Sequence, residues 1–323
     1  MNFLHKLLAY DRICLQCHDN PDADTVAAAF GVYRFLVSQG RRAQIFYGGN
    51  RPMDKSAMKL LVQECGIPIA HVSCLPDCDL LVMVDCQFGL GNAQAFSAER
   101  CMVIDHHILS MPETEDVYVR SEYQSCSTLV YDLLRDAGYD VSGDEDLSVA
   151  LLYGLYTDTS CFADLFRERD SRMKLELFRD QPLFERLVKS NMTQLELMVA
   201  SHAMQYHYSD PEHRFALVEA IQCDQAVLGI IGDFMIQVDA YDLTFTYTRS
   251  HTGYQISLRT CGEGMSARDI AAFVCRGIGT GGGHFRKAGG FIDAELLQRE
   301  CGDKPVFDVI LQRLRDWFAQ REE

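Results

Sequence analysis

The sequence predicts an α/β fold: a parallel-sheet N-terminal domain followed by a smaller, mixed α/β C-terminal domain. Three observations support this prediction. The chain has 323 residues, more than a single hydrophobic core usually organises. In its first half, short apolar runs alternate with helical patterns, as they do in the β-α-β units of a parallel sheet. After a charged helical stretch, the second half begins with closely spaced strand-like runs.

Apolar runs too short for helices predict the strands of the first domain, at residues 13–17, 43–47, 67–72, 80–84 and 101–104. The first helix is expected to begin at Asp24, a candidate cap, and to end at Gly40. A second helix is expected over 56–64. Residues 108–123 are predicted to form a mobile excursion from the fold.

Two further helices complete the predicted first domain, one capped by Ser125 and one over 147–156. Residues 171–204 also have a helical pattern, which breaks at Ser209-Asp-Pro-Glu212. We therefore place the first domain at 1–190, a helical linker at 191–212 and the second domain at 213–323.

The second domain is predicted to contain strands, one capped helix, a glycine-rich loop and a terminal helix. Ser266 to Asp269 resembles a capping box that opens the helix 270–274, and an amphipathic helix follows Pro305. Residues 279–284 are expected to be the loop. The predicted strands cover 215–221, 226–231, 243–248 and 254–258.

The net charge of −16 argues against general binding of long duplex nucleic acid, whose affinity comes from neutralising phosphates. The charge is uneven, however. Residues 249–290 contain six basic and two acidic side chains, a local net charge of +4. This local positive charge indicates binding of a small anionic ligand. The alternative is that these basic residues simply form a solvated surface.

No apolar run approaches the ~18 residues of a membrane span, and the short amphipathic start lacks a signal-peptide cleavage site. We therefore expect a cytoplasmic protein with no membrane partner. The 13 cysteines are scattered and odd in number, which favours reduced thiols over a disulfide framework.

Three predicted strands end at side chains that can bind metals. His18-Asp-Asn-Pro-Asp-Ala-Asp24 follows the first strand, Asp85 follows the run 80–84, and Asp105-His106-His107 follows the run 101–104. Asp158 comes after a helical segment. Because parallel strands bring their carboxyl ends to one edge of the sheet, these side chains are expected to converge.

Four carboxylates and two imidazoles without a cysteine favour two divalent cations, Mn²⁺ or Mg²⁺ before Zn²⁺. Asp85 is the natural bridging ligand, because it stands alone on a strand between the others. Two ions ~3.5–4 Å apart activate a water and clamp the oxygens of a phosphoryl displacement. Taken singly, an aspartate after a strand is more often a cap or turn residue, and a His-His pair is frequently a surface accident; the coincidence of four separate segments that end in such residues outweighs these explanations. The candidate ligands are His18, Asp22, Asp24, Asp85, His106 and Asp158.

The segment Gly281-Gly-Gly-His284, with Arg286 and Lys287 after it, is a candidate phosphate site, because glycines leave backbone amides unshielded. A flexible connection is the alternative. Arg259 can offer a bidentate fork to the same phosphate, although a surface salt bridge explains it equally well.

Together these residues resemble the DHH phosphoesterase family, named for the triplet that stands here as Asp105-His106-His107. The likeness extends over essentially the whole chain. The segment 18–24 looks like the first motif of the family, Asp85 like the second, the triplet like the third and Asp158 like the fourth. The C-terminal region, with Arg259, Gly281–His284 and Ala288–Gly290, looks like the associated substrate-binding domain.

The resemblance implies one manganese held by His18, Asp22 and Asp85, and another held by Asp24, Asp85, His106 and Asp158. Asp105 would orient a ligand histidine, and His107 would face the reacting phosphate. The implied substrate-binding residues are Arg259, Gly282, Gly283, His284, Arg286 and Lys287. This chain has Ala23, Val26 and Ala27 where the first motif usually has glycine and a Gly-Ser pair, which puts the fit of the substrate in question.

The two-domain form is similar to nanoRNases and 3′-phosphoadenosine 5′-phosphate phosphatases. It implies a manganese-dependent phosphoesterase that degrades short oligoribonucleotides to mononucleotides, or converts 3′-phosphoadenosine 5′-phosphate to AMP. The alternatives are a phosphodiesterase for linear or cyclic di-adenylate and a non-catalytic nucleotide-binding regulator. The expected partner is short RNA or a small nucleotide, and a homodimer is left open.

Overall fold

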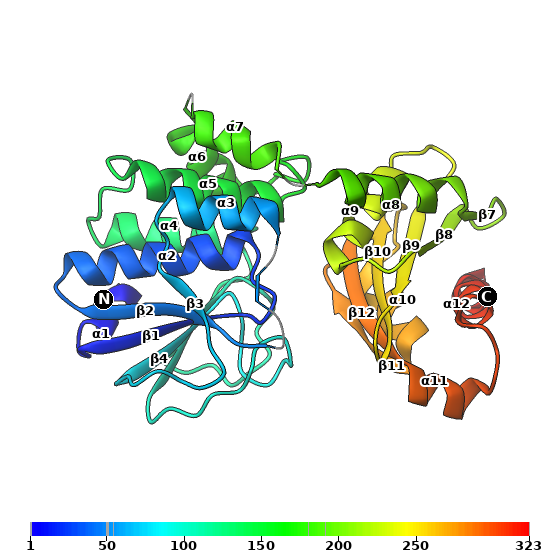
Figure 1. Cartoon of the computed structure of the whole chain (residues 1–323), viewed down its shortest axis with the longest axis horizontal. Coiled ribbons are helices and arrows are strands. Elements are labelled where there is room, and N and C mark those ends of the chain that lie inside the picture. Colours follow the sequence, from blue (N-terminus) through cyan, green and yellow to red (C-terminus); the bar gives the residue numbers. More distant parts are fainter. Residues whose placement is uncertain (1, 50–51, 54, 180, 191, 323) are drawn as a thin grey trace. The chain divides into compact units, whose positions relative to one another are not determined.

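The computed structural model describes residues 2–49, 52–53, 55–179, 181–190 and 192–322. The chain divides into two compact units, Met1–Asn191 and Met192–Glu323, and each has its own sheet and core (Figure 1). Residues 192–212, which belong to the segment expected to be a linker, contribute a helix and a strand to the second unit.

The first unit contains a six-stranded sheet in the order β3-β2-β1-β4-β5-β6, in which every neighbouring pair is parallel. This confirms the predicted parallel sheet. Its central strands are buried on both faces, which is why they appear in the sequence as continuous apolar runs. The strands are β1 (Arg12–Cys17), β2 (Arg42–Tyr47), β3 (Ile69–His71), β4 (Leu80–Val84), β5 (Cys101–Asp105) and β6 (Val117–Val119).

Helices cover one face of this sheet and loops cover the other (Figure 1). Ile13 and Leu15 of β1 pack against the helices, whereas Cys14 lies among loop residues on the opposite face, as the period of two in a strand requires. The helices are α1 (Phe3–Leu7), α2 (Ala23–Ser38), α3 (Ser56–Glu64), α4 (Cys126–Asp136), α5 (Glu145–Asp158), α6 (Glu168–Leu177) and α7 (Pro182–Val188).

Two local predictions for the first unit need correction. Asp22, not Asp24, caps α2, because its extended backbone lets its side chain accept hydrogen bonds from the amides of Asp24 and Thr25. The excursion 108–123 contains β6, which pairs with β5 and closes that edge of the sheet.

The second unit contains a mixed sheet in the order β11-β12-β10-β9-β8-β7, in which only β8 and β9 pair in parallel. Residues alternate along β8: Ala216 and Val218 pack with α8 and α9, whereas Phe215 and Leu217 pack with α10 and α12. The strands are β7 (Tyr208–Asp210), β8 (Phe215–Ala220), β9 (Leu243–Arg249), β10 (Gly253–Thr260), β11 (Gly279–Gly283) and β12 (Lys287–Asp293). The helices are α8 (Gln194–Gln205), α9 (Gln225–Met235), α10 (Ala267–Cys275), α11 (Ala294–Cys301) and α12 (Val306–Glu322).

The strand predicted at 226–231 is wrong, because this segment lies in α9. Short apolar runs do not distinguish a strand from a buried helix by periodicity alone. Gly229 and Gly232 allow α9 to pack close to Arg259: a Cβ on either glycine would lie 3.0–3.1 Å from an Arg259 side-chain atom.

Among the described residues, no helix combines the length and apolar character that crossing a bilayer requires.

Candidate metal centre

The candidate ligands of the first unit gather at the carboxyl edge of its sheet. His18 follows β1, Asp85 follows β4 and Asp105 ends β5. The strand order reverses between β1 and β4, and open α/β sheets bind ligands at such a switch point. The topology therefore brings together three segments that are far apart in the sequence.

Asp85 lies between two groups of ligand atoms. Its Oδ2 is 3.8 Å from His18 Nε2, which is also 3.6 Å from Asp22 Oδ2. Its Oδ1 is 3.4 Å from His106 Nε2. His107 Nδ1 lies 3.7 Å from the same Oδ1. One carboxylate thus has imidazoles near both of its oxygens, the arrangement expected of a bridging ligand.

The second group is centred on His106. Its Nε2 lies 3.5 Å from Asp158 Oδ2 and 3.8 Å from Asp24 Oδ2. Ligand atoms of Asp24, His106 and Asp158 all lie within 4.8 Å of one another, as do those of His18, Asp22 and Asp85. The structure therefore brings all six predicted metal ligands together.

The donor set fits divalent cations. It consists of carboxylate oxygens and imidazole nitrogens, which suit Mn²⁺ or Mg²⁺, and includes no thiolate. Asp85 is 3% exposed, and no described residue donates a hydrogen bond to its Oδ1. A buried carboxylate oxygen without a donor is costly, and a bound cation would compensate for it.

The Asp85 backbone is also strained. Its φ of 61° lies in the left-handed region, which non-glycine residues seldom occupy. Such conformations cluster at functional sites, where the surrounding structure holds them in place. The left-handed turn ends β4 and aims the Asp85 side chain at the two histidines.

The pKa shifts show how crowded this cluster is. Burial and the nearby Asp85 and Asp158 carboxylates raise the pKa of Asp24 well above its ordinary value. Partial burial raises the pKa of Asp158 to about 6, although His106 opposes this shift. Burial lowers the pKa of His106, but the surrounding carboxylates, Asp85 first, outweigh it and raise that pKa. Without cations the cluster therefore retains protons, which metal binding would release.

Asp105 and His107 form a pair beside the cluster. Asp105 is fully buried, and its Oδ1 lies 2.8 Å from both His107 Nδ1 and the amide nitrogen of His106. Burial lowers the pKa of His107, but the hydrogen bond to Asp105 and the Asp85 charge raise it to about 9. Asp105 thus orients the segment that carries both histidines.

In the second unit, the predicted glycine-rich loop is the edge strand β11, which pairs with β12. A Cβ on Gly281 would lie 2.4 Å from the carbonyl oxygen of Ala271, so the close approach of α10 requires glycine there. The Cβ position of Gly282, in contrast, has no described atom within 4 Å other than those of its chain neighbours. Gly283 has a φ of 138°, a conformation that favours glycine.

The turn after β11 is hydrogen-bonded to the first residues of α10. The carbonyls of His284 and Phe285 accept hydrogen bonds from the first amides of α10, those of Arg268 and Ala267. These helix amides therefore already have protein partners. The side chains of His284 and Arg286 are exposed, and that of Lys287 is half-buried.

Arg259 is bound within its own unit. Its side chain is 13% exposed, and its Nε lies 2.5 Å from Asp233 Oδ1 of α9. Its Nη1 donates to Ser257 Oγ and to the carbonyl of Leu258, at 3.0 and 2.9 Å. The Arg259 guanidinium group, predicted to bind a phosphate, is thus already paired with the Asp233 carboxylate.

Comparison with known proteins agrees with this geometry. Residues 12–157 match the DHH family, N-terminal domain. The N-terminal unit is a DHH-family domain.

An uncharacterized protein of Methanocaldococcus jannaschii is 22% identical to this chain over 318 residues, which are 95% of this chain and 64% of that protein. This chain therefore spans less than two thirds of the length of that relative. Among solved structures, an exopolyphosphatase-related protein from Bacteroides fragilis has a TM-score of 0.71 at 17% identity, covering 99% of this chain and 98% of the other. RecJ from Thermus thermophilus, in complex with Mn²⁺, has a TM-score of 0.56 at 14% identity, covering 98% of this chain and 53% of RecJ. Both structures share the fold.

The DHH domain also contains positioning contacts that the sequence did not reveal. The carbonyl of Tyr123 lies 3.3 Å from His106 Nδ1, which leaves Nε2 toward the carboxylates. The next amide, of Gln124, donates to the buried Asp170 carboxylate. A backbone carbonyl carries no sequence signal, and Asp170 lies in a helix far along the chain. A second missed residue, Gln87, contacts Asp105.

The chain after Asp158 in the DHH domain is strained. Ser160, Cys161 and Phe162 have φ values of 52°, 59° and 65°, three consecutive non-glycine residues in the left-handed region. This turn begins two residues after Asp158, the last residue of α5, so it determines the path of the chain away from the cluster.

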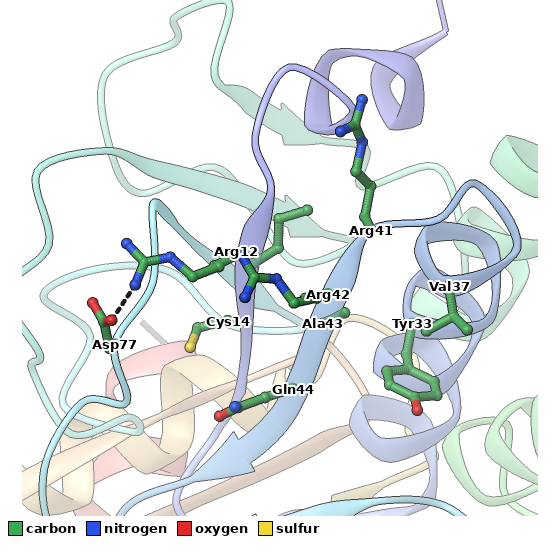
Figure 2. A pocket seen from close by; sticks show the side chains of 10 residues that line it. Arg12, Cys14, Tyr33, Val37, Arg41, Arg42, Ala43, Gln44 and Asp77 are labelled. Atoms are coloured by element: carbon green, nitrogen blue, oxygen red, sulfur yellow. Dashed lines mark hydrogen bonds and ion pairs between the residues drawn. The ribbon is translucent and has the colours of Figure 1, made fainter.

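A depression of about 410 Å³ lies at the opposite, amino-terminal edge of the same sheet (Figure 2). Its wall includes Arg12 and Arg42 at the starts of β1 and β2, and Arg12 pairs with Asp77. The depression contains none of the candidate ligands, so it is separate from the metal centre.

Proposed function

We propose that this chain is a metal-dependent phosphoester hydrolase whose DHH domain holds two divalent cations, Mn²⁺ or Mg²⁺. The observation that carries this proposal is the position of Asp85, whose two oxygens face the His18 group and the His106 group. RecJ, which shares the fold, has been crystallised with each of these two ions, and this supports the choice of metal.

His18, Asp22 and Asp85 would hold one cation, and Asp24, His106 and Asp158 the other, with Asp85 joining the second group through its contact with His106. When bound, such a pair activates a water and stabilises the oxygens that enter and leave in phosphoryl transfer. Asp105 engages His107 Nδ1, so a contact between His107 and the reacting phosphate would be made by Nε2. Tyr123 holds His106 in its orientation from the other side.

We propose short oligoribonucleotides and 3′-phosphoadenosine 5′-phosphate as the substrates. The resemblance of the whole chain to two-domain phosphoesterases supports this choice, and so do the exposed His284 and Arg286 of the second unit. Linear or cyclic di-adenylate is the alternative substrate class. Rates on a dinucleotide, a pentanucleotide, a cyclic dinucleotide and the bisphosphate would distinguish these substrates.

The test of the catalytic proposal is Asp85→Ala. Losing a bridging ligand is expected to reduce Mn²⁺-dependent hydrolysis on the order of a thousandfold. Asp19→Ala is a matched control, because Asp19 lies in the same turn as His18 and is absent from the ligand groups found among the described residues. Undiminished hydrolysis by Asp85→Ala would refute the proposal. Nucleotide binding by a wild-type chain without turnover would favour a regulator.

A further inference from the structure

Gln87 connects the metal centre to the exposed chain that follows His107. It is buried, with 1% exposure, two residues after Asp85. Its Nε2 donates to Asp105 Oδ2 at 2.5 Å and to the carbonyl of Ile108 at 3.1 Å. Its Oε1 accepts from the amide and the hydroxyl of Ser110, at 2.8 and 2.9 Å. A side-chain amide has two donor hydrogens and two acceptor sites, and all four are used here.

These hydrogen bonds fix two features at once. Asp105 holds His107 Nδ1 through one carboxylate oxygen, and Gln87 holds its other oxygen. The Gln87 amide also holds the backbone on both sides of Leu109, through Ile108 and Ser110. The orientation of His107 and the path of the chain after it therefore depend on the same side chain.

The chain that Gln87 holds presents two apolar side chains to solvent. Ile108 is 61% exposed and Leu109 is 40% exposed, directly after His107. Single exposed apolar residues are common and need no explanation. Here two of them are consecutive, their backbone is held by a buried amide, and they border a centre of charged groups. Hydrated phosphates gain nothing from such side chains, whereas a base or ribose would bury apolar surface against them.

We infer that Ile108 and Leu109 contact the organic part of the substrate, and that Gln87 is the positioning residue that holds them and His107 in one arrangement. This inference rests on the proposed function and specifies its substrate class. The DHH domain would favour a nucleoside phosphate ester over inorganic pyrophosphate or polyphosphate.

Binding separates the organic part of the ligand from its phosphate. The full chain, loaded with Mn²⁺, is titrated calorimetrically with AMP and with inorganic phosphate. The double variant Ile108→Ser/Leu109→Ser is expected to bind AMP about tenfold more weakly, while its affinity for phosphate changes less than about twofold. Leu175→Ser, on α6 and 80% exposed in the wild type, is the matched control and should change neither affinity.

Three results would overturn the inference: equal weakening of AMP and phosphate binding, unchanged AMP binding in the double variant, or a wild type that binds AMP no better than phosphate. Because these are binding measurements, they do not depend on turnover. A wild type that binds AMP in the expected way but hydrolyses neither a dinucleotide nor the bisphosphate would instead refute the proposed function.

The role of Gln87 is tested by two variants with different effects. Gln87→Met keeps the volume of the side chain but removes all four hydrogen bonds, so it should lower kcat and raise KM for a dinucleotide. Ser110→Ala removes only the hydroxyl contact, so it should raise KM and leave kcat unchanged. Mn²⁺ affinity should change less than about twofold in both. A lower Tm with wild-type kcat and KM in Gln87→Met would reduce Gln87 to a structural residue, and lost Mn²⁺ binding would place it in the metal site.

Discussion

Asp24 Oδ2 accepts a hydrogen bond from the backbone amide of Cys126 at 2.6 Å, linking the start of α2 to the start of α4. The same oxygen lies 3.8 Å from His106 Nε2, and Asp24 Oδ1 accepts from the amide of Ser127. Asp24 is therefore both an anchor between two helices and a candidate metal ligand. These two roles can be separated by substitution.

In EDTA, Asp24→Asn is expected to lose less stability than Asp24→Ala, because it relieves repulsion in the cluster of acids and keeps one of the two acceptor oxygens that bind the amides of Cys126 and Ser127. Mn²⁺ should raise the Tm of the wild type and have much less effect on this variant. Asp24→Ala loses both acceptors and leaves two buried amides unpaired, so it should lose about 1–3 kcal/mol of stability with or without metal. Thermal unfolding with EDTA and with Mn²⁺ measures both effects. Equal Mn²⁺ stabilisation of wild type and Asp24→Asn would show that Asp24 is not a ligand.

The stability of the metal-free protein should fall as pH rises. The pKa of Asp158 is raised from 3.8 to about 6, and that of His107 from 6.5 to about 9. Both groups bind protons more tightly in the folded state, so their contribution to stability is complete below the ordinary values and is lost as pH rises through the folded ones. Tm in EDTA is therefore expected to decline between about pH 4 and pH 9.

Saturating Mn²⁺ should reverse this trend, because the ligands must be deprotonated to bind the ion. Asp158→Asn is expected to remove the lower step of the decline in EDTA and leave the upper one. Thermal melts across the pH range, with and without metal, check both statements. A metal-free Tm that does not change over this range would contradict them.

Gly281 and Gly282 form a matched pair for testing β11. Gly281→Ala would place a methyl 2.4 Å from the carbonyl oxygen of Ala271, so it should destabilise the fold by about 1–3 kcal/mol. Gly282→Ala meets open space and should leave the Tm unchanged. If the open face of Gly282 contacts substrate, KM should rise in Gly282→Ala alone. Urea unfolding and steady-state kinetics on both variants provide the test, and an unchanged KM in Gly282→Ala would remove Gly282 from the substrate site.

The metal centre was predictable because most of its candidate ligands come at or just after the ends of predicted strands. Apolar runs that stop at Asp85 and at Asp105 mark both the strand and the edge where it ends, so convergence follows from parallel topology. The contacts that orient these ligands were not predictable. Tyr123 acts through a carbonyl, and Gln87 acts through contacts that exist only once β4 and β5 are paired.

The errors in the second unit have a common cause. The apolar run 226–231, with one glycine, fits either a strand or a close-packed helix. The three successive glycines at 281–283 fit either a loop or a strand that packs beneath a helix. In both cases the deciding neighbour lies in another element of the fold: Arg259 of β10 for α9 and Ala271 of α10 for β11. Local patterns do not contain this information.

The ion pair between Arg259 and Asp233 makes a prediction about substrate affinity. Asp233 Oδ1 lies 2.5 Å from Arg259 Nε. If Arg259 binds the substrate phosphate, as we predict, the phosphate competes with this carboxylate. Arg259 is also anchored by Ser257 and by the carbonyl of Leu258, so its orientation does not depend on Asp233 alone. Asp233→Asn should therefore lower the KM for a dinucleotide several-fold at unchanged kcat, because the phosphate no longer competes with a carboxylate.

Asp242→Asn is the matched control, because it weakens another arginine–aspartate pair of the same unit, at 2.9 Å from Arg214. It should leave KM unchanged. A higher KM in Asp233→Asn would mean that the carboxylate orients Arg259 rather than competing with the substrate. An unchanged KM, with only a lower Tm, would mean that Arg259 joins α9 to the sheet and does not contact the substrate, and the phosphate would then have to be bound by His284, Arg286 or Lys287.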